Sequence, residues 1–280
     1  MRRTLQACFL LCLAAFFLFP ACAEDEMVLT QAFFAGKETV SGWIDVPGKG
    51  SMRYYAQNDG LWEKLIYENK ATASNRPFGD SGCCPTAAAM AIRALVPEED
   101  LSKIGALART PYAFCPCSLS KAKCGRNHAR YILTNARDYE RFLPLVLGEF
   151  ASGNNIENVV GRTAARGTAS GFVYHAAEAW GLTVEATSDY DTAFAALSDP
   201  NKAVMAHASR GAAFTNTGHY VVLASADEQY VYVLDPLSRT EYKTKYASKL
   251  NILQPGLVAV AHEDMRYTGI GSFLIFSKGE

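Results

Sequence analysis

The hydrophobic pattern of the chain changes its period near residue 203. Beyond this point, short runs rich in β-branched and aromatic residues alternate with turn residues, which is typical of antiparallel strands. Five such runs are present: KAVMAHA (202–208), GHYVVLAS (218–225), QYVYVLD (229–235), GLVAVAH (256–262) and SFLIFS (272–277). Helical spacing dominates the part before them. Helices first and an antiparallel sheet afterwards predict an α+β fold.

The clearest helix signal lies between Pro85 and Leu95. This run is rich in alanine, its proline fits the first turn of a helix, and Pro97 ends it. Two further helices are predicted at 171–180 and 191–197, the second of them short and capped.

Two segments carry weaker signals. Residues 98–150 are expected to be mostly helical, interrupted by the cysteine loop FCPCSLSKAKC at 114–124. Residues 24–50 are interpreted as an irregular strand or extended N-terminal arm. No linker divides the chain, so we expect one domain over residues 24–280.

The amino terminus has the build of a secretory signal peptide. Two arginines precede the apolar stretch CFLLCLAAFFLF at 8–19, and Ala21-Cys22-Ala23 offers a cleavage site. We therefore exclude residues 1–23 from the fold and expect a secreted or periplasmic protein. A lipid anchor at Cys22 is the less favoured alternative. No later segment approaches the roughly 20 apolar residues that a membrane span needs.

Composition supports a packed globular domain. Hydrophobic residues make up 49% of the chain, charged residues 20%, and the formal net charge is -1. Lysine and arginine form no dense cluster, which argues against a nucleic-acid partner. No cofactor is implied.

The cysteine count leaves a thiol unpaired. Of the 8 cysteines, three fall in residues 1–23, and an odd number remains. Disulfides are the favoured interpretation in an oxidising compartment, and at least one thiol among Cys83, Cys84, Cys115, Cys117 and Cys124 is then left free. The alternative is a zinc site of Cys115, Cys117, Cys124 and His128, whose spacing departs from common zinc patterns.

Two strands flank a turn near Asp227, and they carry a histidine and an aspartate. His219 lies eight residues before Asp227 and Asp235 eight after it. In a regular antiparallel hairpin these two residues would be a direct cross-strand pair, close enough for the carboxylate to orient the imidazole. The alternative is an ordinary polar pair at a strand end, because a slip of one residue in the register breaks the pairing.

The adjacent Cys83 and Cys84 stand at the start of the predicted helix. The helix N-terminus stabilises a thiolate, and a nearby imidazolium lowers the thiol pKa further. A cysteine, a histidine and an aspartate therefore suit an acyl-transfer nucleophile. Alternatively, both cysteines belong to disulfides.

Several motifs together resemble the C39-like cysteine peptidases, which have the papain-like fold. SGCCPTAAAMAI resembles the SGCGPTxxAM motif of that family, and YYAQNDGLW resembles its Q-x-D-x-x-W segment. FTNTGHYVVL resembles the T-x-x-GH element, VYVLDP resembles a strand ending in Asp-Pro, and GTASGFVYHAAEAWGL is similar to the segment between them. The motifs keep the family's order.

The resemblance implies roles for individual residues. It makes Cys83 the nucleophile, His219 the general base, Asp235 the orienting carboxylate and Gln57 the oxyanion-hole side chain. Asn58 or Asn75 are alternatives to Gln57. Cys84 stands where the family motif has glycine, which is a departure. With Cys83 free as the implied nucleophile, Cys84, Cys115, Cys117 and Cys124 are the cysteines expected to form disulfides.

The resemblance implies a secreted thiol-dependent hydrolase that cleaves a peptide or related amide bond through a thioester. No ATP-binding motif appears, so we do not expect the peptidase part of a transporter. Cell-wall peptide, host protein and self-processing remain open as substrates. Two alternatives stand: a non-catalytic binding module of the same fold, and amidase or transpeptidase acyl transfer.

Overall fold

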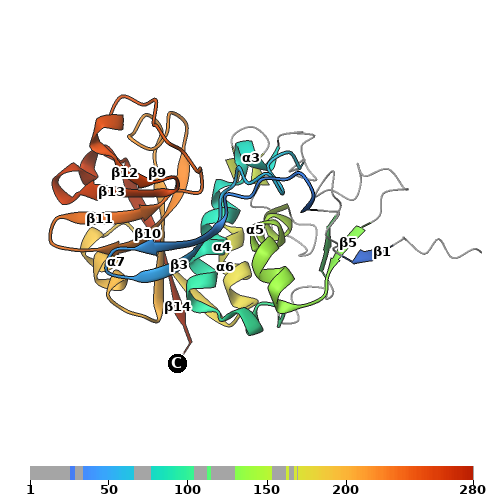
Figure 1. Ribbon diagram of the computed structural model, residues 1–280. Helices are drawn as coiled ribbons and strands as arrows, with labels where there is room; N and C mark the ends of the chain where they lie inside the picture. The colour runs from blue at the N-terminus through green and yellow to red at the C-terminus, as the bar shows by residue number, and fades with distance from the viewer. Residues whose placement is uncertain are drawn as a thin grey trace, which may run out of the picture.

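The computed structural model describes residues 26–28, 34–65, 77–103, 112–114, 130–152, 162–163, 167–168 and 170–279. Most helices gather on one side of the molecule and a large sheet forms the other side (Figure 1). The α+β prediction is confirmed. None of the helices in these ranges combines the length and apolar character needed to cross a membrane.

The sheet has seven strands in the order β12-β13-β11-β10-β9-β14-β8, and every neighbouring pair is antiparallel. Its strands are β8 (Leu182–Thr187), β9 (Lys202–Ala208), β10 (His219–Ala226), β11 (Tyr230–Leu234), β12 (Asn251–Gln254), β13 (Leu257–Ala261) and β14 (Ile270–Lys278). The five predicted strands are confirmed. The prediction missed β8 and β12, the two edge strands, which are largely exposed and lack the apolar runs that marked the others.

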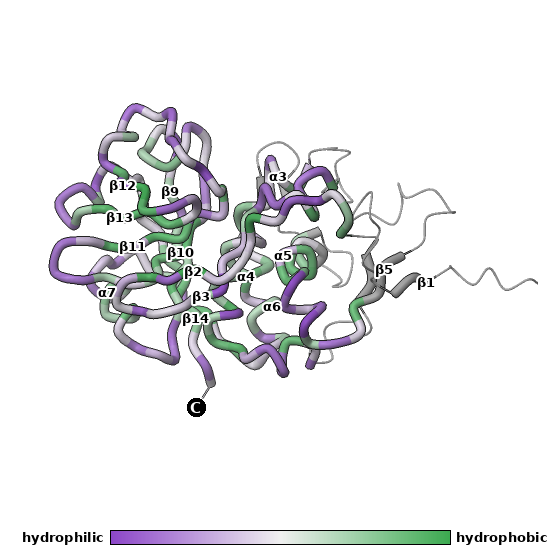
Figure 2. Tube along the Cα trace, viewed as in Figure 1, coloured by the Kyte–Doolittle hydropathy of each residue, from purple (hydrophilic) through white to green (hydrophobic). Residues whose placement is uncertain are grey.

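Both faces of the sheet are buried. Along β9, β10, β11 and β13, successive apolar residues alternate between two separate hydrophobic clusters. Helix α4 (Cys83–Leu95) covers one face, and α7 (Tyr190–Leu197) covers the other. Hydrophobic residues accordingly concentrate along the central strands (Figure 2).

Helix α4 is the central helix of the molecule. Nearly all of it is buried, because α5 (Ala136–Ser152) packs on one side and strands β9 and β10 lie on the other. Alanine is its commonest residue, at five of 13 positions, which suits a helix enclosed by close neighbours. The predicted helix at 85–95 is confirmed and begins two residues earlier.

The other predicted helices are present as α6 (Phe172–Glu178) and α7, which begins at the N-cap Asp189. The expectation for 98–150 is wrong in part: only α5 and a short 3-10 turn are helical among its described residues. Two strands lie there instead, β4 (Tyr112–Phe114) and β5 (Arg130–Leu133). They pair with each other, and β5 also pairs with β1 (Glu26–Val28), since their aromatic and branched residues favour extended chain.

The described part of residues 24–50 is more ordered than an arm. After β1 it contains β2 (Gly42–Val46), which pairs antiparallel with β3 (Gly50–Tyr54). Gly48 and Gly50 have positive φ values of 72° and 80°, so this turn requires glycine. The hairpin brings Tyr54 to the sheet, where its hydroxyl donates to the Asp235 carbonyl at 2.8 Å.

The remaining elements are short. They are α3 (Phe78–Ser81), the strand pair β6 (Arg162–Thr163) and β7 (Gly167–Thr168), and the 3-10 turns η2 (Glu98–Asp100), η3 (Ala247–Lys249) and η4 (His262–Tyr267).

Candidate active site

Cys83 is the first residue of α4 and is half-buried. The junction between α3 and α4 needs glycine at position 82, because a Cβ there would lie 2.6 Å from the Phe78 ring and 2.7 Å from the Phe78 carbonyl oxygen. The backbone N–H of Thr86 donates to the Gly82 carbonyl at 3.0 Å and opens the helix. Cys83 therefore occupies the positive end of a 13-residue helix.

His219 begins β10, and Asp235 directly follows β11. Both are buried, and His219 Nε2 lies 2.5 Å from Asp235 Oδ1. The imidazole also lies beside the Cys83 thiol, and each of the two groups shifts the pKa of the other. Because Nε2 faces the carboxylate, Nδ1 is the nitrogen left for the thiol. The ring thus lies between sulfur and carboxylate.

The register that brings His219 to Asp235 differs from the prediction. Val222 pairs with Leu234 and Leu223 with Val233, so His219 is a diagonal neighbour of Asp235 and not its direct partner. A β-bulge between Leu223 and Ser225 adds one residue to β10. Without it, the side chains of His219 and Asp235 would point to opposite faces.

Asp235 is held from several directions. The Leu237 N–H donates to Oδ1 at 2.8 Å, and the Tyr242 hydroxyl donates to Oδ2 at 2.5 Å. Arg239 Nε lies 3.7 Å from Oδ2, and its guanidinium stacks 4.9 Å from the Tyr242 ring centroid. The buried carboxylate thus has partners on both oxygens, as a buried charge requires.

The charges of the three groups support one another. Burial lowers the pKa of His219, but the Asp235 carboxylate and the Cys83 thiol outweigh burial and raise it to about 9. Burial raises the pKa of Cys83, yet the hydrogen bond and charge of His219, with the backbone N–H groups of Tyr220 and Cys84, bring it below its ordinary value. Burial likewise opposes ionisation of Asp235, and His219 nevertheless holds its pKa low. The arrangement favours a thiolate beside an imidazolium.

Cys84 differs from its expected role. It is a free thiol, fully buried in the hydrophobic cluster around α4. Burial, and next to it the charge of Cys83, raises the pKa of this thiol. The expected bridge from Cys84 is therefore not present: the side chain points into the core, where it packs as a small apolar group.

Gln57 and Asn58 form hydrogen bonds with the loop that follows Asp235. The Gln57 N–H donates to the Pro236 carbonyl at 2.7 Å, and Asn58 exchanges two hydrogen bonds with the backbone of Ser238, at 3.0 and 3.4 Å. Gln57 Nε2 donates to the carbonyl of Gly79, four residues before Cys83, at 2.6 Å. Gln57 Nε2 has a second N–H, and so does Asn58 Nδ2, but Asn58 is held by the Ser238 backbone through both its Oδ1 and its Nδ2.

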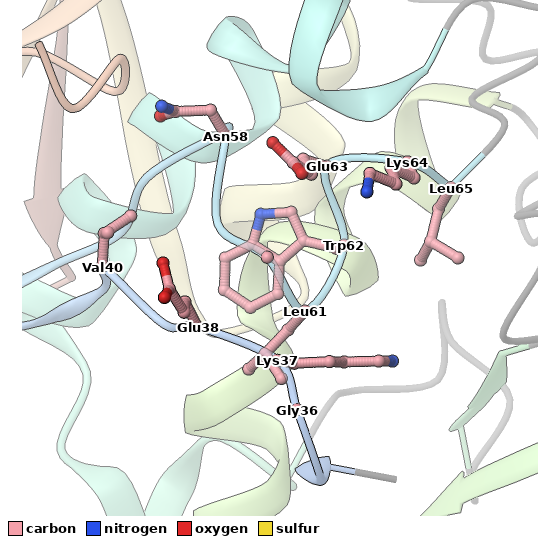
Figure 3. Close-up of a pocket in the computed structure, with 11 residues that line it drawn as sticks. Gly36, Lys37, Glu38, Val40, Asn58, Leu61, Trp62, Glu63, Lys64 and Leu65 are labelled. Atoms are coloured by element: carbon pink, nitrogen blue, oxygen red, sulfur yellow. The ribbon is translucent and has the colours of Figure 1, made fainter.

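A hollow of about 460 Å³ opens beside Asn58. Figure 3 shows the segment from Gly36 to Val40 on one side of it and the segment from Asn58 to Leu65 on the other. The Gly79 N–H donates to the Glu63 carbonyl at 2.8 Å. This bond connects the 58–65 side of the hollow to the residues that precede Cys83. The charged residues of the hollow are of both signs: Lys37, Glu38, Glu63 and Lys64.

Several predicted residues lie outside the described ranges: the signal peptide with Cys22, the alternative oxyanion residue Asn75, and the cysteine loop with Cys115, Cys117, Cys124 and His128. In the part of the chain that the structure describes, no group of three or more potential metal ligands comes together.

The sequence profile of the peptidase C39-like family matches residues 51–254, more than half of the chain. The chain belongs to the peptidase C39-like family. Membership indicates a cysteine peptidase, and it bears out the expected papain-like α+β fold. None of the curated proteins compared with the chain matches it.

In this C39-like peptidase, sequence reasoning missed the residues that hold the carboxylate. Tyr242 and Arg239 lie in a loop after β11 that carries no periodic pattern, so their approach to Asp235 had no signal in the sequence. Tyr54 was part of a recognised motif, but its contact with the Asp235 carbonyl depends on the β2–β3 hairpin.

Proposed function

We propose that Cys83, His219 and Asp235 form the catalytic triad of an exported cysteine peptidase. The observation that carries this proposal is the His219 ring, which lies between the Cys83 thiol and the Asp235 carboxylate. This arrangement supplies a thiolate nucleophile, a proton carrier, and a group that fixes the orientation of the carrier.

The reaction proceeds in two steps. The Cys83 sulfur attacks the scissile carbonyl carbon, the C–N bond breaks, and the His219 imidazolium gives its proton to the leaving amine. Water then attacks the thioester with His219 as base, the C–S bond breaks, and the thiol and a carboxylic acid are released. Asp235 stabilises the imidazolium and transfers no proton.

Two donors are available for the oxyanion. One is the backbone N–H of Cys83 at the start of α4, and the other is the amide N–H of Gln57 that the Gly79 carbonyl leaves uncommitted. The contact of Gln57 with Gly79 supports this role, because it keeps the amide beside the residues that lead to Cys83. The removal of one such donor typically lowers kcat by about 10²–10³-fold.

The substrate proposed is a peptide or protein. The hollow beside Asn58 supports this class, since its lysines and glutamates suit a chain that carries charges of both signs. The signal-peptide pattern at residues 1–23 supports an exported enzyme. The buried position of Cys84 supports catalysis, because the residue that replaces the motif glycine does not face solvent.

The test is thiol-dependent hydrolysis of a fluorogenic peptide library by the chain without residues 1–23. Cys83→Ser should abolish cleavage, and Cys84→Ser should retain it. We expect His219→Ala to lower kcat/KM by roughly 10²–10⁴-fold, and Asp235→Asn by less. Added amine nucleophiles distinguish hydrolysis from transpeptidation by the products. Cleavage by the Cys83→Ser protein at the wild-type rate would refute the assignment.

A further inference from the structure

A second hollow, of about 260 Å³, adjoins the first, and Leu61 and Trp62 line both of them. It is bounded by β3 and by the first turns of α5. Three arginines face it: Arg53 from β3, and Arg137 and Arg141 from α5.

The acidic residues nearby already have partners. Glu140 lines the hollow, and its Oε1 accepts from Arg93 Nε at 2.7 Å. Asp59 lies close to Arg141, but its carboxylate accepts hydrogen bonds from the Thr39 hydroxyl and from the backbone N–H groups of Val40, Ser41 and Leu61. Within the described ranges, none of the three arginines forms an ion pair.

Arg53 is held in place, but one of its hydrogen-bond donors has no partner. Its guanidinium lies 5.1 Å from the centroid of the Tyr55 ring and contacts the Tyr55 hydroxyl. Its Nε is buried without a hydrogen-bond partner. A buried donor without a partner is costly, and an acceptor oxygen on a ligand would remove that cost.

Arg137 and Arg141 are four residues apart on α5, so two like charges share one face of the helix. Such a pair destabilises a helix unless an anion lies between the charges. Arg141 is further fixed by the Phe34 ring, whose centroid lies 3.7 Å from its guanidinium carbon. Burial lowers the pKa of Arg141, Asp59 and Asp138 oppose this shift, and the charge of Arg53 adds to it. Asp138 already accepts a hydrogen bond from Asn135 Nδ2 at 2.8 Å.

We propose that Arg53, Arg137 and Arg141 form a binding site for a small oxyanion, a phosphate or a carboxylate group. The planar guanidinium group pairs with two oxygens at once, and three such groups from two elements surround the hollow. The site is separate from the triad, and its occupancy does not depend on the proposed peptidase reaction.

Binding is measured by isothermal titration and by thermal unfolding of the Cys83→Ser protein, in sodium phosphate and in sodium citrate. Sodium chloride at matched ionic strength is the reference. We expect a saturable rise in Tm with phosphate or citrate that chloride does not reproduce. Comparison of the two salts distinguishes a phosphate ligand from a carboxylate ligand.

Arg137→Gln provides the sharpest variant, because this arginine is exposed and its loss relieves repulsion. Without the anion its Tm should equal or exceed that of the parent, whereas its anion affinity should fall by about tenfold or more. Arg53→Gln and Arg141→Gln should weaken binding likewise. Arg210→Gln, at an exposed loop arginine, is the matched control. Equal anion shifts in parent and Arg137→Gln, or a shift that chloride reproduces, would overturn the proposal.

Discussion

The Asp235 carboxylate fixes the orientation of His219 through one ring nitrogen, and the Cys83 thiol interacts with the same imidazole. Residue type and motif position singled out Cys83, His219 and Asp235 in the sequence, and the structure brings these three residues together. The same reasoning gave the wrong state for Cys84, because a buried thiol and a bridged thiol have the same sequence signal. Only packing distinguishes them, and packing places Cys84 in the core.

The thiol reactivity of Cys83 tests the charge arrangement without a substrate. Since His219 lowers its pKa, native Cys83 should react with iodoacetamide at a lower pH than a free thiol of pKa about 8.5. His219→Ala removes that cause, so the pH profile of alkylation should move upward. Cys84 should stay unlabelled until the protein unfolds, because it is fully buried. Mass mapping of the alkylated protein reads both thiols, and label on native Cys84 would contradict the assignment.

The hydrogen bond from Tyr242 to Asp235 predicts that Tyr242 is a positioning residue of the proposed triad. Tyr242→Phe removes a 2.5 Å hydrogen bond from a buried carboxylate, so the pKa of Asp235 should rise. We expect kcat to fall by about tenfold while KM changes little, since Tyr242 is buried and reaches the site only through Asp235. Tyr232→Phe is the matched control, because it removes a 2.6 Å bond to Asp227 in a remote turn. Equal kinetics in the two variants would rule out the positioning role.

At the scale of elements, the register of the β10–β11 hairpin decides whether a site exists. The alternating pattern predicted both strands. It placed the turn at Asp227, whereas the Asp227 N–H donates to the Tyr230 carbonyl and the turn extends over 227–230. The bulge in β10 then restores the shared face of His219 and Asp235. The sequence prediction misplaced the turn and missed the bulge, and these two errors offset each other. Neither the turn length nor the bulge has a residue-type signal in this sequence.

The α3–α4 junction is a second element-scale determinant, and Gly82→Ala tests it. The added methyl group would clash with the ring and carbonyl of Phe78, so the junction must shift and displace Cys83. We expect a loss of roughly 1–3 kcal/mol in the free energy of unfolding, with a fall in kcat/KM. Gly171→Ala is the control, because a Cβ there meets nothing within 4 Å and the backbone is helical. Unchanged stability in Gly82→Ala would show that the junction tolerates a side chain.

At the scale of the molecule, the candidate site forms where the two halves meet. The helical half supplies Cys83, the sheet half supplies His219 and Asp235, and the β2–β3 hairpin carries Tyr54 to the Asp235 backbone. Local patterns predicted each half, since helices and central strands bury periodic apolar faces. They did not predict the edge strands or the hairpin contact, because those positions are set by tertiary packing.

The shifted pKa values of His219 and Asp235 make the free energy of unfolding depend on pH. The folded pKa of His219, about 9, exceeds its unfolded value of about 6.5. The contribution of His219 to the free energy of unfolding is therefore complete below pH 6.5 and is lost as the pH rises through 9. The folded pKa of Asp235 is depressed, so its contribution is present above its unfolded value near 3.9 and is lost as the pH falls below it.

The Tm difference between wild type and His219→Gln should accordingly be largest from about pH 4 to 6.5 and should shrink toward pH 9. Thermal unfolding across this range measures it, with exposed His175→Gln as the control for the loss of a histidine. Removal of His219 also leaves Asp235 as a buried carboxylate without its imidazolium, which enlarges the difference inside the window. A difference that stays constant to pH 9 would mean that His219 is neutral in the folded protein, and the proposed thiolate–imidazolium pair would then be wrong.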